Sequence, residues 1–165
     1  MRDQLAQHLD QHSLIKNSQH GFSKTFLEFV TACIDDKLNV DTVNLDLAKA
    51  FDKVPHQRLL LKLKVHDIDG LVCNWILAWL ADRKQWVCQD GSCSSWRRVW
   101  SGVPQGSLLG PVLILILIND LDNDLPSSVL KFADDTKLYR VVMNQEDGSL
   151  LQEDLDTISS WAARW

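Results

Sequence analysis

The sequence predicts an α+β fold, and three features indicate it. Apolar and polar residues alternate over residues 42–47, which is the pattern of a half-buried strand. The pair Asp134-Asp135 lies between two β-prone runs and predicts a tight hairpin with both acids at its tip. Several longer segments repeat apolar residues at helical spacing. We therefore expect an antiparallel sheet with helices packed behind it.

The first half of the chain is predicted to be mostly helical. Helices are expected over 3–12 and 25–38, before the strand at 42–47, and again over 56–66 and 70–81. In the last of these helices the expected apolar face consists of Leu71, Trp75, Leu77, Ala78 and Ala81, broadened by Trp79.

The second half begins with a two-stranded hairpin over 85–100, for which Asp90-Gly91 is a strong turn signal. A loop over 101–106 leads into a helix over 107–118, and the hairpin that bears the two acids follows. A final helix begins near Glu146. Its core positions, at helical spacing, are Leu151, Leu155, Ile158, Ala162 and Trp165.

Composition favours one globular domain but not a strongly cationic one. The chain has 165 residues and is 45% apolar, which is enough for a real core. Its net charge of −5 is unusual for a protein that binds nucleic acid, because such binding depends on neutralising phosphates. Basic residues cluster locally in Arg83-Lys84 and Arg97-Arg98, although most such pairs are solvated surface. The negative net charge indicates that part of a nucleic-acid-binding surface is missing.

The four cysteines have no Cys-x-x-Cys spacing, so a zinc site is not predicted. Cys88 and Cys93 flank the expected turn at Asp90-Gly91 and could face each other, but an intracellular setting would leave them as free thiols. No apolar run of signal-peptide type opens the chain. The apolar run over 108–118 is too short to span a bilayer.

Asp46 ends the first predicted strand and points to the face opposite Val43 and Leu45. A carboxylate in that place can meet the acid pair of a neighbouring hairpin. Three carboxylates could then hold two Mg²⁺ ions roughly 3.5–4 Å apart, an arrangement used for in-line phosphoryl displacement. The alternative for Asp134-Asp135 is an ordinary solvated turn. Asp52 is interpreted as a cap for the turn into the helix after Pro55.

Between the acidic segments lies a loop with two glycines and a proline, Ser101-Gly102-Val103-Pro104-Gln105-Gly106-Ser107. Glycine lets backbone approach a ligand closely, and Gln105 offers both a donor and an acceptor. The alternative is a plain strand-to-helix loop.

These segments, together with Leu45-Asp46-Leu47-Ala48-Lys49-Ala50-Phe51-Asp52 and Phe132-Ala133-Asp134-Asp135, occur in the order and approximate spacing of reverse transcriptases. The chain resembles more narrowly those of non-LTR (LINE-type) retrotransposons, and the resemblance extends from about Leu5 to Trp165. The flanking segments that agree are Gln19-His20-Gly21-Phe22, Lys53-Val54-Pro55-His56, Leu109-Gly110-Pro111, Ile118-Asn119-Asp120-Leu121 and Lys131.

The resemblance implies an RNA-directed DNA polymerase that transfers a nucleotide from a dNTP to a primer 3′-hydroxyl on an RNA template. It implies a polymerase palm-type sheet over 41–165 and a partial fingers segment over 1–40. Asp46, Asp134 and Asp135 would be the catalytic residues and the ligands of two Mg²⁺ ions, with Mn²⁺ as a substitute.

The same resemblance implies a set of nucleotide-binding residues: Leu47, through its carbonyl, Phe51, Gln105, Gly106 and Lys24. Phe51 would collide with a 2′-hydroxyl and so select deoxynucleotides, although a buried core aromatic is the structural alternative. This residue and the form of the Gly-Val-Pro-Gln-Gly loop argue against an RNA-templated RNA polymerase.

The chain also departs from the family. A basic, glycine-containing stretch expected after Phe22 is shortened, which leaves Lys24 as the candidate phosphate ligand. Earlier fingers and the thumb are expected to be missing parts of a parent polyprotein. We therefore expect weak or no polymerisation by this chain alone and an exposed Trp161/Trp165 surface.

The alternative function is a non-catalytic remnant of a retroelement that acts as a binding or interaction module. Its contact surface would be the exposed palm face or the C-terminal helix with Trp161 and Trp165. Nuclear or cytoplasmic residence, without a membrane partner, follows from the resemblance alone.

Overall fold

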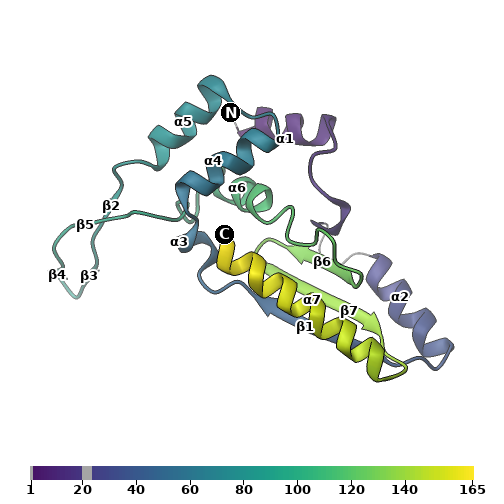
Figure 1. The fold of residues 1–165 in the computed structure, drawn as a ribbon. Helices are drawn as coiled ribbons and strands as arrows, with labels where there is room; N and C mark the ends of the chain where they lie inside the picture. The colour runs from purple at the N-terminus through teal and green to yellow at the C-terminus, as the bar shows by residue number, and fades with distance from the viewer. Residues whose placement is uncertain (1, 20–23) are drawn as a thin grey trace. The chain divides into compact units, whose positions relative to one another are not determined.

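The computed structural model describes residues 2–19 and 24–165, which form two compact units (Figure 1). The first unit consists of Met1–Leu9 and Lys49–Leu117, and the second of Asp10–Ala48 and Ile118–Trp165. Helices and antiparallel strands occur in both units, so the predicted α+β class is confirmed. The division into fingers over 1–40 and palm over 41–165 stays a prediction.

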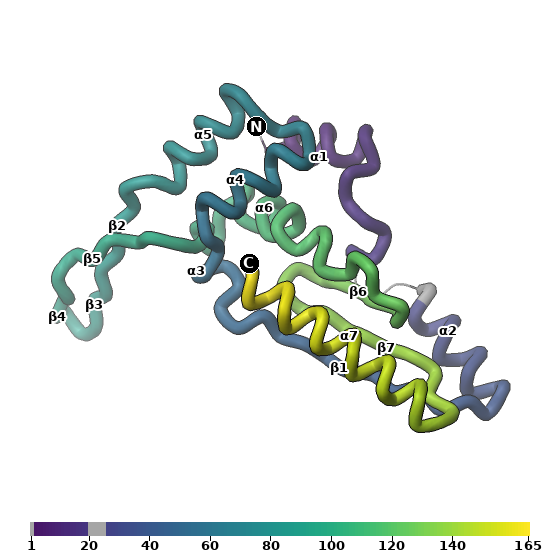
Figure 2. The backbone as a smooth tube through the Cα atoms, viewed as in Figure 1, coloured from purple at the N-terminus to yellow at the C-terminus, as the bar shows by residue number. Residues whose placement is uncertain are grey.

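The second unit is built on a three-stranded antiparallel sheet in the order β1-β7-β6 (Figure 2). These strands are β1 (Val40–Asp46), β6 (Ser128–Phe132) and β7 (Asp135–Val141). Its helices are η1 (Asn17–Gln19), α2 (Lys24–Asp35) and α7 (Gln145–Arg164). The predicted strand at 42–47 is present as β1, which runs from Val40 to Asp46. The predicted hairpin that bears Asp134 and Asp135 is present as β6 and β7.

The two faces of this sheet differ because side chains alternate along each strand. One face packs against α7 in a core of Leu121, Leu138, Leu151 and Ile158 (Figure 1). On the other face, Tyr139 of β7 meets two rings of α2, with centroid distances of 4.9 Å to Phe26 and 5.1 Å to Phe29. The helix α2 thus contacts the Tyr139 end of this face.

The helix α7 begins at Gln145, one residue before its predicted start. The Asn144 side chain accepts a hydrogen bond from the Asp147 N–H at 3.0 Å, and the Asp147 carboxylate accepts one from the Met143 N–H at 3.0 Å. This reciprocal capping satisfies backbone donors that a helix start leaves open. Trp161 is half-buried and its indole N–H donates to Asp120 Oδ1 at 3.0 Å. Because Trp165 is half-buried too, the expected exposed Trp161/Trp165 surface is not present.

The first unit packs helices around a core of fully buried side chains. Its elements are α1 (Arg2–Gln11), which begins in this unit, α3 (Ala50–Lys53), α4 (His56–Val65), α5 (Gly70–Leu80) and α6 (Gly110–Leu117). The most deeply buried side chains from these helices are Leu59, Leu63, Ile76, Leu80, Leu113, Ile114 and Ile116. In the part of the chain that the structure describes, no helix has both the length and the apolar character needed to cross a bilayer.

The buried face of α5 differs from the prediction. Cys73, Ile76 and Leu80 point into the core, whereas Leu71 is 88% exposed and Trp75 is 44% exposed. The helix is apolar on nearly every side, so the spacing of apolar residues does not identify the side that packs. The predicted face was therefore wrong although the helix itself was right.

The helix α6 begins at Gly110, three residues after the predicted start at Ser107. The Ser107 hydroxyl donates to the Pro104 carbonyl at 2.7 Å and accepts from the Gly110 N–H at 3.0 Å. These bonds hold residues 104–109 as a capping turn before the helix.

A narrow antiparallel ribbon projects between α5 and the loop that precedes α6 (Figure 1). Its strands are β2 (Lys84–Gln85), β3 (Cys88–Gln89), β4 (Ser92–Cys93) and β5 (Arg97–Arg98). The turn lies at Asp90-Gly91 as predicted, with positive φ angles of 49° and 80°. Both angles are those required by the common two-residue hairpin turn.

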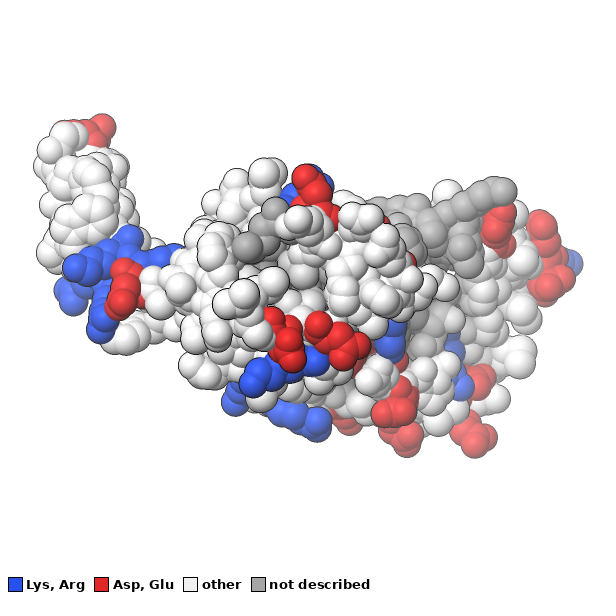
Figure 3. Space-filling model, turned by 90° about the horizontal axis from the view of Figure 1, so that it is seen from above, with Lys and Arg blue, Asp and Glu red and all other residues white. Residues whose placement is uncertain are grey.

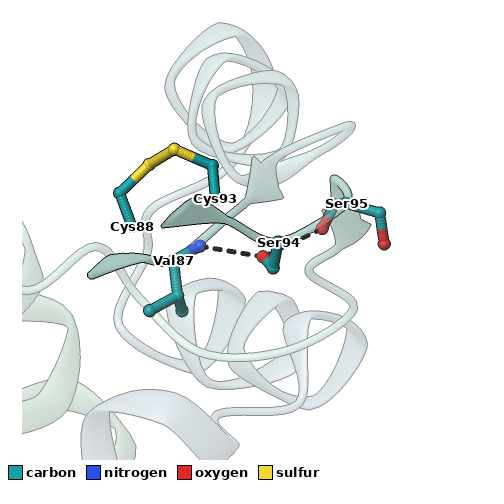
Figure 4. The surroundings of a disulfide bond; sticks show 5 residues. All are labelled: Val87, Cys88, Cys93, Ser94 and Ser95. Carbon is teal, nitrogen blue, oxygen red and sulfur yellow. Dashed lines mark hydrogen bonds between the residues drawn. A yellow bond between two sulfur atoms is a disulfide. The ribbon is translucent and has the colours of Figure 1, made fainter. Parts of the chain in front are cut away.

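The cysteines beside this turn form a disulfide, so the expectation of free thiols is wrong for Cys88 and Cys93 (Figure 4). They are direct cross-strand partners with Cα atoms 4.1 Å apart, and Ser94 secures the same end by accepting from the Val87 N–H. Cys33 and Cys73 are free and buried.

This pairing makes a simple labelling prediction. When the chain is denatured without reductant and treated with iodoacetamide, mass spectrometry is expected to find two labelled cysteines, Cys33 and Cys73. Prior reduction should raise the number to four, the full cysteine content of the chain. Label on Cys88 or Cys93 without reduction would contradict the disulfide.

Candidate active site

The end of β1 and the start of β7 bring two of the three predicted acids together. Asp46 is the last residue of β1, Asp135 is the first of β7, and the two are direct cross-strand partners. Such partners project from the same face, with Cβ atoms about 5 Å apart. Both side chains are exposed. The predicted direction of Asp46 is confirmed, because Val43 and Leu45 pack in the core on the other face.

The turn between β6 and β7 positions the third acid. Phe132 and Asp135 close the turn as cross-strand partners, so Ala133 and Asp134 are its two central residues. Ala133 has a left-handed backbone with φ of 52°, as a tight hairpin turn requires at its first central position. Of the two adjacent acids, only Asp134 lies at the tip of the turn, and its side chain is half-buried. The prediction of both acids at the tip is wrong, because Ala133 occupies one of its two positions.

An open groove of about 370 Å³ lies beside these acids. Side chains of the same sheet face contribute to its lining, namely Asn44, Asp46, Leu130, Phe132, Asp135 and Lys137. Phe132 is 61% exposed, and the Lys137 ammonium lies 4.5 Å from the centroid of the Phe26 ring. The groove therefore combines two carboxylates, an accessible aromatic ring and one cation.

The donor set at this end of the sheet suits a hard cation. Carboxylate oxygens are the ligands that Mg²⁺ takes in proteins, and Asp46 and Asp135 offer them from one face. Within residues 2–19 and 24–165, no three His, Cys, Asp or Glu side chains gather closely enough to hold a metal ion. The structure thus shows a carboxylate pair with Asp134 next to it in the chain. Metal binding by all three acids stays a prediction.

A buried lysine supports the hairpin that bears the acids. Lys131 immediately precedes Phe132 and is 0% exposed. Its ammonium donates to the carbonyls of Ile118 at 3.3 Å and Asn119 at 3.0 Å, and to Asp122 Oδ1 at 2.7 Å. In the sequence this lysine stands out only as a flank of the acidic motif. Its position two residues after Val129 places it on the core face of β6, which is the signal that could have revealed it.

Asp122 is the centre of this network. Its carboxylate also accepts from the Lys16 ammonium at 2.9 Å and from the Ser18 hydroxyl at 2.6 Å. Burial raises the pKa of Asp122, but hydrogen bonds from Lys131, Ser18 and Lys16 outweigh it and leave that pKa below its usual value. Burial lowers the pKa of Lys131, against the opposing attraction of Asp122. The ammonium and the carboxylate form an ion pair in which the Lys131 side chain is fully buried and that of Asp122 is 11% exposed.

The structure describes the side chain of Leu47 but not that of Lys24, the two residues predicted to contact metal and phosphate. Leu47 follows β1, is half-buried and packs its side chain against the α7 core, which leaves the predicted role to its carbonyl. Lys24 opens α2, but its side chain lies outside the described part of the structure. The flanking residues His20, Gly21 and Phe22 also lie outside it.

The remaining predicted residues belong to the first unit. Phe51 lies in α3, is half-buried, and its carbonyl accepts a hydrogen bond from the Val103 N–H at 2.7 Å. Gln105 and Gly106 are exposed two and three residues further along the same loop. Phe51 and the Gly-Val-Pro-Gln-Gly loop are therefore joined by backbone contacts, as the two motifs would require. Their nucleotide-binding roles stay predictions.

Gly102 makes this junction possible. Its backbone φ is 80°, and a Cβ atom there would lie 2.5 Å from the Phe51 carbonyl oxygen and 2.6 Å from that of Asp52. The loop glycines were predicted to let the backbone approach a ligand closely. At Gly102 the close neighbour is instead the backbone of α3.

Asp52 is not the predicted cap. It lies within α3, and the N-cap residue of α4 is Pro55, which makes no side-chain cap hydrogen bond. Its carboxylate is exposed, while its backbone carbonyl accepts from the Ser101 hydroxyl at 2.7 Å. The short helix α3 occupies the segment that was interpreted as a turn.

Arg83 and His56 hold the other side of the same loop. Arg83 donates to the carbonyls of Leu80 and Ser101, each at 3.0 Å, and to that of Gly102. His56 Nε2 lies 2.9 Å from the Gly102 carbonyl. Burial lowers the pKa of Arg83. The interpretation of Arg83 as solvated surface is therefore wrong, because its guanidinium ties the ribbon base to the loop.

Comparisons with known proteins agree with the motifs. The sequence profile of the family described as "Reverse transcriptase (RNA-dependent DNA polymerase)" matches residues 1–165. The chain is 31% identical over 159 residues to the "RNA-directed DNA polymerase from mobile element jockey" of Drosophila funebris, covering 89% of this chain and 17% of that protein. The protein of the same description from Drosophila melanogaster is 30% identical over 161 residues, with the same coverage.

A third relative is the "Probable RNA-directed DNA polymerase from transposon BS" of Drosophila melanogaster. It is 32% identical over 155 residues, which cover 88% of this chain and 17% of that protein. The chain thus spans about a sixth of the length of the curated relatives that it matches.

Proposed function

Because this chain belongs to the reverse transcriptase (RNA-dependent DNA polymerase) family, we propose that it provides the catalytic carboxylates of an RNA-directed DNA polymerase. The reaction is transfer of a nucleotide from a dNTP to a primer 3′-hydroxyl, directed by an RNA template. The observation that carries this proposal is the pairing of Asp46 with Asp135 at an open groove, with Asp134 in the adjoining turn.

In this proposal Asp46, Asp134 and Asp135 hold divalent metal, Mg²⁺ or Mn²⁺. The bound metal would lower the pKa of the attacking hydroxyl and stabilise the leaving pyrophosphate. The carboxylates themselves contribute three negative charges that a cation neutralises. Asp46 and Asp135 are exposed at one end of the sheet, beside the open groove in which the primer terminus and the triphosphate would lie.

The first-unit residues would act on the incoming nucleotide. Phe51 would exclude a 2′-hydroxyl from the sugar position, and Gln105 and Gly106 would line the nucleotide and template pocket. The backbone bond between Phe51 and Val103 supports a joint role, because it couples the aromatic residue to the loop. Lys24 and the Leu47 carbonyl would contact phosphate and metal, respectively.

The proposal is tested first by metal binding to this chain. Isothermal titration calorimetry with Mg²⁺ or Mn²⁺, in the presence of dNTP, should show binding that the Asp134→Asn variant loses. Asp41→Asn is the matched control, because Asp41 is an exposed carboxylate at the opposite end of β1. Equal binding by the wild-type chain and Asp134→Asn would contradict the assignment of the metal site.

Primer extension on an RNA template then tests the reaction itself. We expect weak extension by the isolated chain, since a displacement of about 1 Å at the reacting atoms can cost a hundredfold in rate. Whatever extension occurs should disappear in Asp134→Asn and persist in Asp41→Asn. Extension that survives Asp134→Asn would remove the carboxylates from the mechanism.

A further inference from the structure

The ribbon presents aromatic and cationic side chains together on one face. Its register pairs Lys84 with Arg98, and continuing the register pairs Trp86 with Trp96, whose ring centroids are 5.3 Å apart. Since side chains two residues apart share a face, Trp100 follows Arg98 on this side, and the Arg98 guanidinium lies 4.7 Å from the Trp100 ring centroid. We call these five residues the ribbon face.

The ribbon face is accessible and positively charged within an acidic chain. Trp86 is 46% exposed, Trp96 61% and Trp100 75%, although large aromatic side chains are usually well buried. Residues 82–100 contain four basic and two acidic side chains, a balance of +2, whereas the whole chain has −5. The Arg98 guanidinium also contacts the Asp82 carboxylate, in an exposed ion pair of the kind that contributes little to stability. Figure 3 shows the Lys and Arg side chains gathered at the base of the ribbon.

The ribbon is held in shape at both ends. At its base Arg83 is anchored to the carbonyls of Leu80 and Ser101, and the Val99 N–H donates to the Arg83 carbonyl at 2.9 Å. At its tip the Cys88–Cys93 disulfide closes the turn. A surface ordered before binding loses less conformational entropy when a ligand arrives.

We propose that the ribbon face binds single-stranded nucleic acid. Bases would stack on Trp86, Trp96 and Trp100, because every base has a π-face and stacking of this kind is tolerant of sequence. Lys84 would neutralise one phosphate, and Arg98 would neutralise another by exchanging its exposed contact with Asp82 for it. Trp96 and Trp100 are separated by four residues, about 13 Å of extended chain, which matches about four stacked nucleotides.

The alternation of charges among the rings favours this ligand over a protein partner. Trp and Arg are common in protein interfaces as well, but lysine is depleted there, so Lys84 beside the rings is the feature that favours a single strand, whose binding sites combine a basic track with stacking rings. Binding here would require neither metal nor dNTP. The inference rests on the proposed function only in the choice of RNA as the first probe.

Fluorescence anisotropy with a labelled, unstructured 12-nucleotide RNA tests the ribbon face on the 165-residue chain. The buffer contains EDTA, so that metal bound by the carboxylates plays no part. Trp96→Ala is expected to weaken RNA binding about tenfold, while Trp96→Phe keeps most of the affinity. Trp75→Ala is the aromatic control, because Trp75 is exposed on α5 of the same unit and should not matter.

Salt dependence tests the cationic half of the site. Arg98→Gln should reduce the slope of log affinity against log salt by about 0.7, the value for one phosphate contact with a single strand. Arg97→Gln is the matched control, since Arg97 pairs with Gln85 and points to the opposite face of the same strand. It should change the slope less than Arg98→Gln does.

A DNA oligonucleotide of the same sequence distinguishes the two kinds of strand. Equal affinity would support stacking and phosphate contact alone, and tighter RNA binding would add recognition of the 2′-hydroxyl. Unchanged RNA affinity in Trp96→Ala would overturn the proposal. So would a loss of self-association in Trp96→Ala without a loss of RNA binding, which would make this face a protein contact. Either result would leave the metal-binding test of Asp134 unaffected.

Discussion

Replacing Lys131 with methionine is expected to destabilise the chain by about 3–5 kcal/mol, the usual cost of breaking a buried ion pair. Methionine matches much of the lysine stem, so the loss comes from the ammonium group rather than from a cavity. Without it, the carbonyls of Ile118 and Asn119 and one oxygen of Asp122 lose a buried donor. Lys16 and Ser18 still bond Asp122, which favours the lower end of the range.

Urea unfolding followed by tryptophan fluorescence measures this loss, with Lys64→Met as the control because Lys64 is exposed on α4. Lys131→Met should also weaken metal binding, since Lys131 lies directly before the turn that bears Asp134. A loss of less than 1 kcal/mol would show that the network around Asp122 does not support the hairpin.

The pH dependence of stability provides an independent check on the same network. The pKa of Asp122 is lowered in the folded chain, so as the pH falls the unfolded chain takes up a proton first and stability decreases. The contribution of Asp122 is thus present at neutral pH and is lost below about pH 4. In Asp122→Asn, this part of the acid dependence should be absent.

Elements with a strict local pattern could be predicted from the sequence. The alternation in β1 placed Asp46 on the open face correctly, because a two-residue period decides the face of every side chain in a strand. The turn at Asp90-Gly91 was also predicted correctly, because few residue pairs other than Asp-Gly and Asn-Gly adopt two successive positive φ angles. In both cases neighbours in the chain determine the outcome.

Predictions failed where partners distant in the chain decide the environment. The Arg83-Lys84 pair looks like solvated surface until the carbonyls that surround the Arg83 guanidinium are known, and the sequence predicted no environment for Lys131. Lys16 and Asp122 meet across 106 positions of sequence, a contact that no local pattern contains. The face of α5 failed for a different reason, because an all-apolar helix offers no polar side to mark the solvent.

Replacing Gly102 with alanine is expected to be as damaging as the loss of Lys131, for purely steric reasons. A left-handed backbone costs an alanine about 1–2 kcal/mol, and overpacking against fixed neighbours adds about 1–3 kcal/mol. Here the neighbours are backbone atoms, the carbonyl oxygens of Phe51 and Asp52 at 2.5 and 2.6 Å, which no side-chain rotation relieves. We therefore expect a destabilisation of about 3 kcal/mol.

Gly106→Ala separates the two contributions, because Gly106 has a similar φ of 75° but no atom within 4 Å of the added Cβ. It should cost only about 1 kcal/mol in the same urea experiment. The difference between the variants then measures the close contact of the loop with α3. If Gly102→Ala costs no more than Gly106→Ala, the contact is not rigid. Phe51 would then not be held against the loop, and a joint role in selecting deoxynucleotides would lose its structural support.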